Sequence, residues 1–204
     1  MNNKGLTLVE VIAVLVILSI IALIVTPNIT GNIKDYKERT LESQLSSVKG
    51  ALKNWTADNI NKVTCSEDSV EALFVPITVL QDDAYLDEKI SNPYGGYLDD
   101  TDTFGLVSCK TIVDETGKMA TNYKYTYGAY LDDNDYIKKM AIEYVKDHTN
   151  TTSYVTVDTL KSENYIYNTI KKINDLTVNI PSKRVRVTVE KIEEGKYKYK
   201  ASFD

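Results

Sequence analysis

One stretch of sequence decides the fold: Lys4-Gly5-Leu6-Thr7-Leu8-Val9-Glu10, which is followed by apolar residues as far as Val25. Between Leu6 and Val25 the only polar residues are Thr7, Glu10 and Ser19, and only Glu10 carries a charge. Twenty helical residues are about 30 Å long, enough to cross the hydrocarbon of a bilayer. A carboxylate inside such a segment is costly unless a partner meets it, so Glu10 indicates a functional site.

Three interpretations of this stretch compete. A cleaved secretory signal would have a shorter apolar core and a small-x-small cleavage site after it, whereas Ile24-Val25-Thr26 is a poor site of that kind. A plain membrane anchor explains the length of the run but gives no reason for Glu10. In the third interpretation the chain is cut between Gly5 and Leu6, and the apolar run stays on the mature protein.

The basic residue, the glycine, the apolar run and the acid at this spacing resemble the leader junction of type IV pilins and pseudopilins. In that family a membrane peptidase cuts after the glycine and methylates the new N-terminus. The resemblance implies a leader peptide at residues 1–5, with Gly5 as its last residue. Leu6 would be the methylated first residue of the mature chain, although Phe or Met is commoner there. Glu10 would be the acidic fifth residue, which takes part in assembly.

The resemblance also implies a function and a location. The chain would be a type IV pilus subunit used in adhesion or motility, and a doubled head would favour a minor or tip-proximal one. It would cross the cytoplasmic membrane once before assembly and then join an extracellular filament. Its expected partners are other pilins, the prepilin peptidase and the assembly machinery, with no cofactor and an unknown surface ligand. Two alternatives are a pseudopilin of a type II secretion or DNA-uptake machine, and a membrane-tethered binding module.

A second apolar pattern follows Pro27 at spacings of mostly three and four residues, which predicts an amphipathic helix. One helix should therefore run from near Leu6 to about Asn59, with a membrane-spanning or filament-core part at 6–27. Pro27 predicts a bend or, as in many pilins, a segment that unwinds inside a filament. The residues of the apolar stripe are Ile29, Ile33, Tyr36, Leu41, Leu45, Val48, Leu52 and Trp55.

The rest of the chain predicts an α+β head in which the amphipathic half of the helix packs on antiparallel sheet. Residues 75–86 align with residues 155–166 at a constant offset, each after a helical segment and before a probable hairpin. The hairpins are expected at 106–130 and 184–203, where strands alternate polar and apolar residues. This pattern favours two pilin-like head units, at 28–132 and 133–204, over a chance similarity of small α+β segments.

Composition restricts the other possibilities. The net charge of −5 and the pI near 5.1 argue against nucleic acid as the default partner. The two cysteines, Cys65 and Cys109, suit one disulfide in an exported domain, and two buried free thiols are the alternative. Such a bond would close a loop of roughly 45 residues, for which chain entropy predicts roughly 4 kcal/mol of stabilisation.

The sequence contains no recognisable catalytic constellation, so we expect no enzyme. His148 is the only histidine, the cysteines lack zinc-site spacing, and no glycine-rich phosphate loop is present. Fifteen tyrosines fit half-buried strands or an adhesive surface. Clustered carboxylates offer weak calcium candidates, with solvated turns as the alternative. These carboxylates are Asp99, Asp100, Asp102, Asp132, Asp133 and Asp135.

Overall fold

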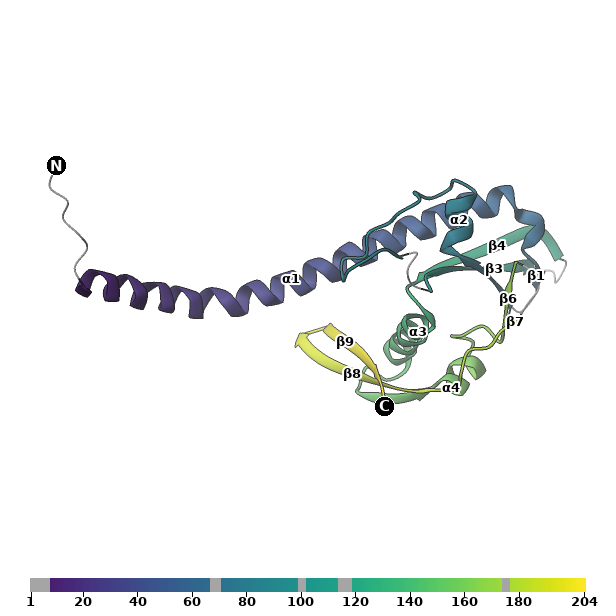
Figure 1. Cartoon of the computed structure of the whole chain (residues 1–204). Coiled ribbons are helices and arrows are strands. Elements are labelled where there is room, and N and C mark those ends of the chain that lie inside the picture. The colour runs from purple at the N-terminus through teal and green to yellow at the C-terminus, as the bar shows by residue number, and fades with distance from the viewer. Residues whose placement is uncertain (1–7, 67–70, 99–101, 114–118, 174–176) are drawn as a thin grey trace. The chain divides into compact units, whose positions relative to one another are not determined.

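The computed structural model of the chain describes residues 8–66, 71–98, 102–113, 119–173 and 177–204 (Figure 1). The chain divides into two compact units, Met1–Ser43 and Gln44–Asp204. Helix α1 (Leu8–Asp58) supplies the described part of the first unit and the beginning of the second. The side chains of residues 21–32 lie outside the described part of the structure.

The single long helix predicted from the sequence is confirmed over the described residues, and its last residue, Asp58, lies next to the expected Asn59. Helix α1 is continuous through Pro27. The bend or unwinding expected at Pro27 stays a prediction, because that side chain is among those not described. At its other end α1 buries Leu45, Val48, Leu52 and Trp55, the last four residues of the predicted apolar stripe.

The second unit contains short helices and two sheets. Its elements after α1 are η1 (Ile60–Lys62), β1 (Cys65–Ser66), β2 (Glu71–Pro76), α2 (Ile77–Asp82), β3 (Phe104–Val113), β4 (Met119–Tyr130), α3 (Asp133–His148), β5 (Ser153–Thr156), α4 (Val157–Ser162), β6 (Thr169–Lys172), β7 (Thr177–Val178), β8 (Arg184–Glu193) and β9 (Lys196–Phe203). Both predicted hairpins are present, as β3–β4 and β8–β9. Helix α3 begins where the side chain of Asp132 accepts a hydrogen bond from the Asp135 N–H, as an N-cap does.

The two sheets differ in their pairing. The first sheet has the order β1-β3-β2-β6-β7, with β4 paired to β3, and the second has the order β5-β8-β9. The expected antiparallel pairing is found in the second sheet and in much of the first. The first sheet is mixed, however, because β1 pairs with β3 in parallel and β2 pairs with β6 in parallel. The β2–β6 pairing joins residues 71–74 to residues 169–172, so it links the two halves of the unit.

Helices and sheets alternate through this unit (Figure 1). The C-terminal part of α1 packs on one face of the first sheet, where Leu52 lies over Gly105. The opposite face of that sheet meets α3, since the rings of Phe104 and Tyr136 are 6.4 Å apart. The other side of α3 packs on the second sheet through Val185 and Val187, and all these contacts around α3 belong to one buried core.

The two halves of this unit share the same strand register. In the first half β2 pairs with β3 so that Pro76 faces Phe104, and in the second half β5 pairs with β8 so that Thr156 faces Arg184. Both residues of the second pair lie 80 positions after those of the first. The short helices α2 and α4 also enter alike: the N–H of Ile77 donates to Thr103 O and that of Val157 donates to Lys183 O, at 3.0 Å in both cases.

The same turn follows each short helix. Ala84 and Asn164 both adopt the left-handed conformation, with φ of 61° and 60°. The tyrosine that comes next donates its hydroxyl to an aspartate near the end of the preceding long helix: Tyr85 to Asp58 of α1, and Tyr165 to Asp147 of α3. Helix α3 therefore takes the place in the second half that the end of α1 takes in the first. Because both halves share one core, the domain boundary at 132/133 stays a prediction.

Candidate functional site

The first candidate site is the N-terminal part of α1. Its apolar side chains are exposed around the whole helix, and Leu8 is 77% and Leu15 is 58% accessible. Glu10 lies in the first helical turn, where the helix dipole stabilises a carboxylate. Gly5 and Leu6, the expected cleavage and methylation sites, lie outside the described residues. An exposed apolar surface of this extent marks a site that contacts lipid or protein.

The expected membrane span at 6–27 is only partly described. No helix within the described part of the chain is long and apolar enough to cross a membrane. Residues 6, 7 and 21–27 of the expected span are outside the part that this finding covers.

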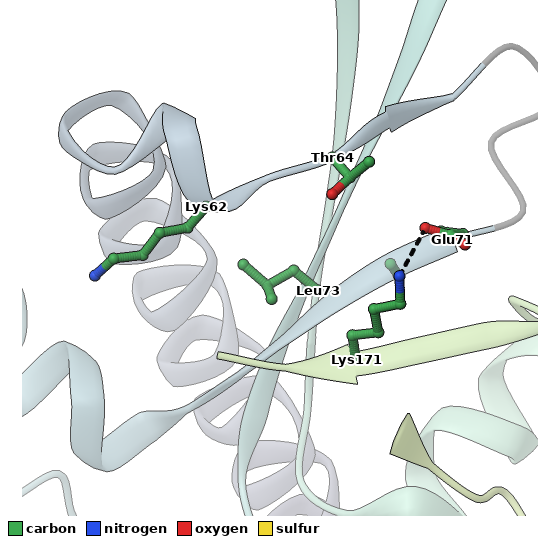
Figure 2. A pocket seen from close by; sticks show the side chains of 6 residues that line it. Lys62, Thr64, Glu71, Leu73 and Lys171 are labelled. Carbon is green, nitrogen blue, oxygen red and sulfur yellow. Dashed lines mark hydrogen bonds and ion pairs between the residues drawn. The ribbon is translucent and has the colours of Figure 1, made fainter. Parts of the chain in front are cut away.

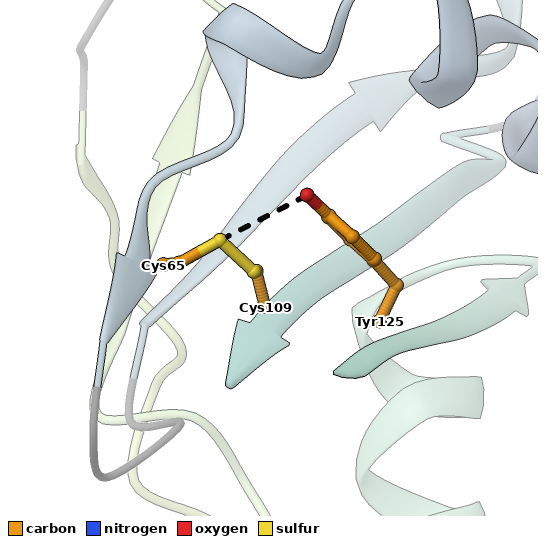
Figure 3. The surroundings of a disulfide bond; sticks show 3 residues. All are labelled: Cys65, Cys109 and Tyr125. Atoms are coloured by element: carbon orange, nitrogen blue, oxygen red, sulfur yellow. Dashed lines mark hydrogen bonds between the residues drawn. A yellow bond between two sulfur atoms is a disulfide. The ribbon is translucent and has the colours of Figure 1, made fainter. Parts of the chain in front are cut away.

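The two cysteines lie together in the second unit (Figure 3). Strands β1 and β3 pair so that Cys65 faces Cys109, and the two residues form a disulfide with their Cα atoms 4.5 Å apart. Cys109 is fully buried and Cys65 is half-buried. The Tyr125 hydroxyl lies 3.9 Å from the Cys65 Sγ. The bond ties the two-residue strand β1 to the sheet beneath α1.

A small pocket lies beside β1, at the start of β2 (Figure 2). Lys62 and Thr64 line one side of it, and the Lys171 ammonium lies 3.5 Å from a carboxylate oxygen of Glu71 on the other. Glu71 and Lys171 are on β2 and β6, so this ion pair spans the parallel pairing between the two halves. Both groups are partly exposed, and an exposed ion pair is typically worth no more than about 1 kcal/mol. The pocket brings together no group that suggests catalysis.

The acidic calcium candidates are partly brought together. Asp102, Asp132 and Asp133 line one hollow, and Lys172 and Lys183 line it too. Asp99 and Asp100 lie outside the described residues, and Asp135 instead accepts hydrogen bonds from the Leu131 N–H and the Lys139 ammonium. Within the described ranges, no three His, Cys, Asp or Glu side chains are grouped so that they could hold a metal ion.

The electrostatics of this hollow follow from its composition. Burial, and next the charges of Asp132 and Asp102, raise the pKa of the Asp133 carboxyl, while Lys183 and Lys172 lower it. Asp132 also serves as the N-cap of α3. Asp132 and Asp135 therefore already have roles in the fold, and the choice between calcium ligands and solvated turns stays a prediction.

His148 lies at the end of α3. Its ring stacks on that of Tyr144, with the centroids 4.2 Å apart, and its Nδ1 lies 2.9 Å from the Tyr144 carbonyl oxygen. The side chain is exposed. The ring of Tyr165 also lies edge-on to the imidazole, with the centroids 5.9 Å apart, so His148 closes an aromatic cluster at the helix end.

Sequence reasoning missed a cluster of cations on the second sheet. Arg184 and Arg186 flank the ring of Tyr154, with their guanidinium carbons 4.2 and 5.8 Å from its centroid. A signal was present in the repeat, because the residues 80 positions earlier are Phe104, Leu106 and Phe74, all of them apolar. A comparison of the two halves position by position would have found this change.

An apolar helix with one acid in its first turn, joined to an α+β head with a disulfide, defines a pilin-like class of protein. Residues 1–26 match the family model described as the prokaryotic N-terminal methylation motif. The chain is similar to type II secretion system core protein G of Aeromonas hydrophila, with 31% identity over 100 residues that make up 46% of this chain and 69% of the relative. The chain belongs to the type IV pilin and pseudopilin family.

Two further relatives have a similar identity to the chain. Core protein G of Pectobacterium carotovorum is 31% identical over 100 residues, which cover 46% of this chain and 64% of the relative. The ComG operon protein 3 homolog of Bacillus licheniformis is 31% identical over 62 residues, or 30% of this chain and 64% of the relative. The chain thus spans somewhat less than two thirds of the length of these two curated relatives. No solved structure matches it significantly.

Proposed function

We propose that this chain is a structural subunit of a membrane-anchored filament, with no catalytic role of its own. It is cut between Gly5 and Leu6, methylated on Leu6, held in the cytoplasmic membrane by residues 6–27 and then polymerised through the same helix. The observation that carries the proposal is the exposed, all-round apolar surface of α1 from Leu8 to Ile20. A segment of this kind needs lipid before assembly and neighbouring helices afterwards.

Glu10 would control docking. Cleavage leaves an α-amine on Leu6, and in a growing filament the Glu10 carboxylate of one copy can meet the amine of its neighbour. An unpaired charge left inside an apolar bundle costs roughly 3–5 kcal/mol, so a subunit docked out of register is disfavoured. The pair would act through specificity more than through net stability.

The test replaces Glu10 in the chain expressed in its native host. Glu10→Val should leave the chain in the membrane fraction and remove it from filaments sheared off the cells. Glu42→Val is the matched control, because Glu42 is an exposed acid further along the same helix. Sheared wild-type protein should have Leu6 at its N-terminus. Normal incorporation of Glu10→Val, or a sheared protein that still starts at Met1, would refute the proposal.

Two machines fit this subunit. A type IV pilus, used in adhesion or motility, is the first candidate. A pseudopilin of a type II secretion or DNA-uptake machine is the second, and the names of the core protein G relatives favour it. Antibody labelling of surface filaments separates the two: a pilus subunit should label long filaments on unmodified cells. A pseudopilin should label none, and its deletion should block export of secreted proteins or uptake of DNA.

A further inference from the structure

The second sheet has one face that no element of the chain covers among the described residues. Val185 and Val187 point to α3 and are buried, whereas Arg184 and Arg186 on the opposite face are exposed. The same face holds Tyr154 of β5, and Lys198 and Lys200 of β9, whose register partners on β8 are Glu190 and Thr188. We call Arg184, Arg186, Lys198 and Lys200, with Tyr154, the cationic face. Two carboxylates share this face, Asp204 at 3.6 Å from Arg184 and Glu190 opposite Lys198, so four cations face two acids and the balance is positive.

The face of the first sheet that corresponds to the cationic face is covered by a helix. The residues that correspond to Tyr154, Arg184 and Arg186 are Phe74, Phe104 and Leu106, and they pack against α3. The rings of Phe74 and Phe104 stack at 4.4 Å, and Phe104 and Leu106 are 2% exposed. A helix therefore sits on this face in the first half, held by apolar contacts. In the second half the same positions carry cations, so a partner there must be acidic or polar.

A surface that meets this description lies at the other end of the alternating layers. The exposed carboxylates Asp82, Asp87 and Glu88 line a hollow of about 640 Å³, together with Ser47 and Asn54 of α1. We call these five residues the acidic groove. It consists of a polar helix flank edged by carboxylates, which complements the cationic face in charge and offers it a helix to pack on.

We propose that the cationic face of one copy docks on the acidic groove of the next copy. This inference rests on the proposed filament function and names the contact between heads that such a filament would use. The two surfaces differ, so the contact is heterologous and can continue indefinitely, as a filament requires. Within one copy, α3 packs on the face of the first sheet that is turned away from α1. In the proposed contact, the end of α1 from the next copy packs in the same way on the outer face of the second sheet. Opposite charges on the two surfaces also fix the register and disfavour like-with-like pairing.

The test is a charge swap in the full chain, expressed in the native host. Arg184→Glu with Arg186→Glu should lower recovery in sheared filaments about tenfold or more, because it sets carboxylates against carboxylates. Adding Asp87→Lys with Glu88→Lys to the same chain should restore recovery. Lys110→Glu with Lys124→Glu is the matched control: it makes the same change in net charge on an exposed cross-strand pair of the β3–β4 hairpin and should leave recovery unchanged.

Each other outcome has a defined meaning, provided that thermal unfolding of the detergent-solubilised chain shows each variant folded. Normal recovery of Arg184→Glu with Arg186→Glu, or a loss that the groove variants do not restore, overturns the inference and leaves the proposed function standing. An equal loss in the Lys110 and Lys124 control overturns it as well. Absence of the wild-type chain from filaments overturns both. Duplex DNA binding that these arginine changes abolish while recovery stays normal assigns the face to nucleic acid instead.

Discussion

Gly105→Val should destabilise the head strongly only while residue 52 is leucine. A Cβ at position 105 would lie 2.8 Å from Leu52 Cδ2, and Leu52 is fully buried and cannot move aside. The tyrosine contacts place Asp147 of α3 where α1 has Asp58, 89 positions earlier, so Leu52 corresponds to Ala141. Gly105 corresponds to Val185 at the strand offset of 80, and Ala141 and Val185 are both fully buried. The larger side chain is on the helix in the first half and on the strand in the second half. The second half therefore already has the pairing of a small helix residue with valine that the double variant would create.

The magnitudes follow from packing. Gly105→Val alone should cost about 1–3 kcal/mol by overpacking. Leu52→Ala alone should cost about 2–5 kcal/mol, since it removes a buried side chain and leaves a void. The double variant copies the arrangement of Ala141 and Val185, so the valine fills the void. It should be more stable than the sum of the single variants predicts, by about 2 kcal/mol.

The assay is guanidinium unfolding of the full chain in detergent, followed by the fluorescence of Trp55, the sole tryptophan. Trp55 is buried and donates its Nε1–H to Asp83 at 2.8 Å, so unfolding moves it into water. Leu160→Ala combined with Gly105→Val is the control, because Leu160 lies on α4 in the buried core around α3, which does not include Leu52, and that pair should be additive. Additivity of Leu52→Ala and Gly105→Val within about 0.5 kcal/mol would refute the reasoning.

Three further predictions concern the head. Cys65→Ser with Cys109→Ser should lower the free energy of unfolding by about 4 kcal/mol, because the bond joins residues 44 positions apart, and reduced wild type should show the same guanidinium midpoint. Asp132→Ala should lower the free energy of unfolding by about 1 kcal/mol, measured by thermal unfolding, because it removes the acceptor 2.7 Å from the Asp135 N. Asp132→Asn should retain most of the stability of the wild type, because asparagine also caps helices. Asp133→Asn should stabilise the head at pH 7. Burial raises the pKa of Asp133 in the folded state, so wild type should gain stability as pH falls through that raised pKa, and calorimetry over a pH series should show the difference from Asp133→Asn disappear in acid.

The features that the sequence predicts well are those encoded locally. The limits of α1 follow from an apolar pattern sustained over fourteen turns, and the β8–β9 hairpin follows from strict alternation around Gly195, which adopts a φ of 76°. Helix α3 starts at Asp133, because Asp132 caps it and Asp133 can therefore be helical. The leader motif and Glu10 are likewise readable from a few consecutive residues.

The features that the sequence hides depend on distant pairing. Strand β1 has two residues and β6 has four, too few for a periodic signal, and each pairs in parallel with a strand far away in the chain. The ion pair of Glu71 with Lys171 exists only because of that pairing. The cationic face was hidden for another reason: Arg184 and Arg186 look like ordinary solvated residues until they are compared with Phe104 and Leu106.

The β2–β6 pairing also affects how the protein is made. Strand β2 is finished at residue 76, but its neighbour ends at Lys172, almost a hundred residues later. Until that segment has been synthesised, a nascent head exposes one bare strand edge and the rings of Phe74 and Phe104. Bare edges recruit other chains, so folding competes with aggregation throughout this interval. A gene shortened after residue 132 would make that vulnerable intermediate permanent.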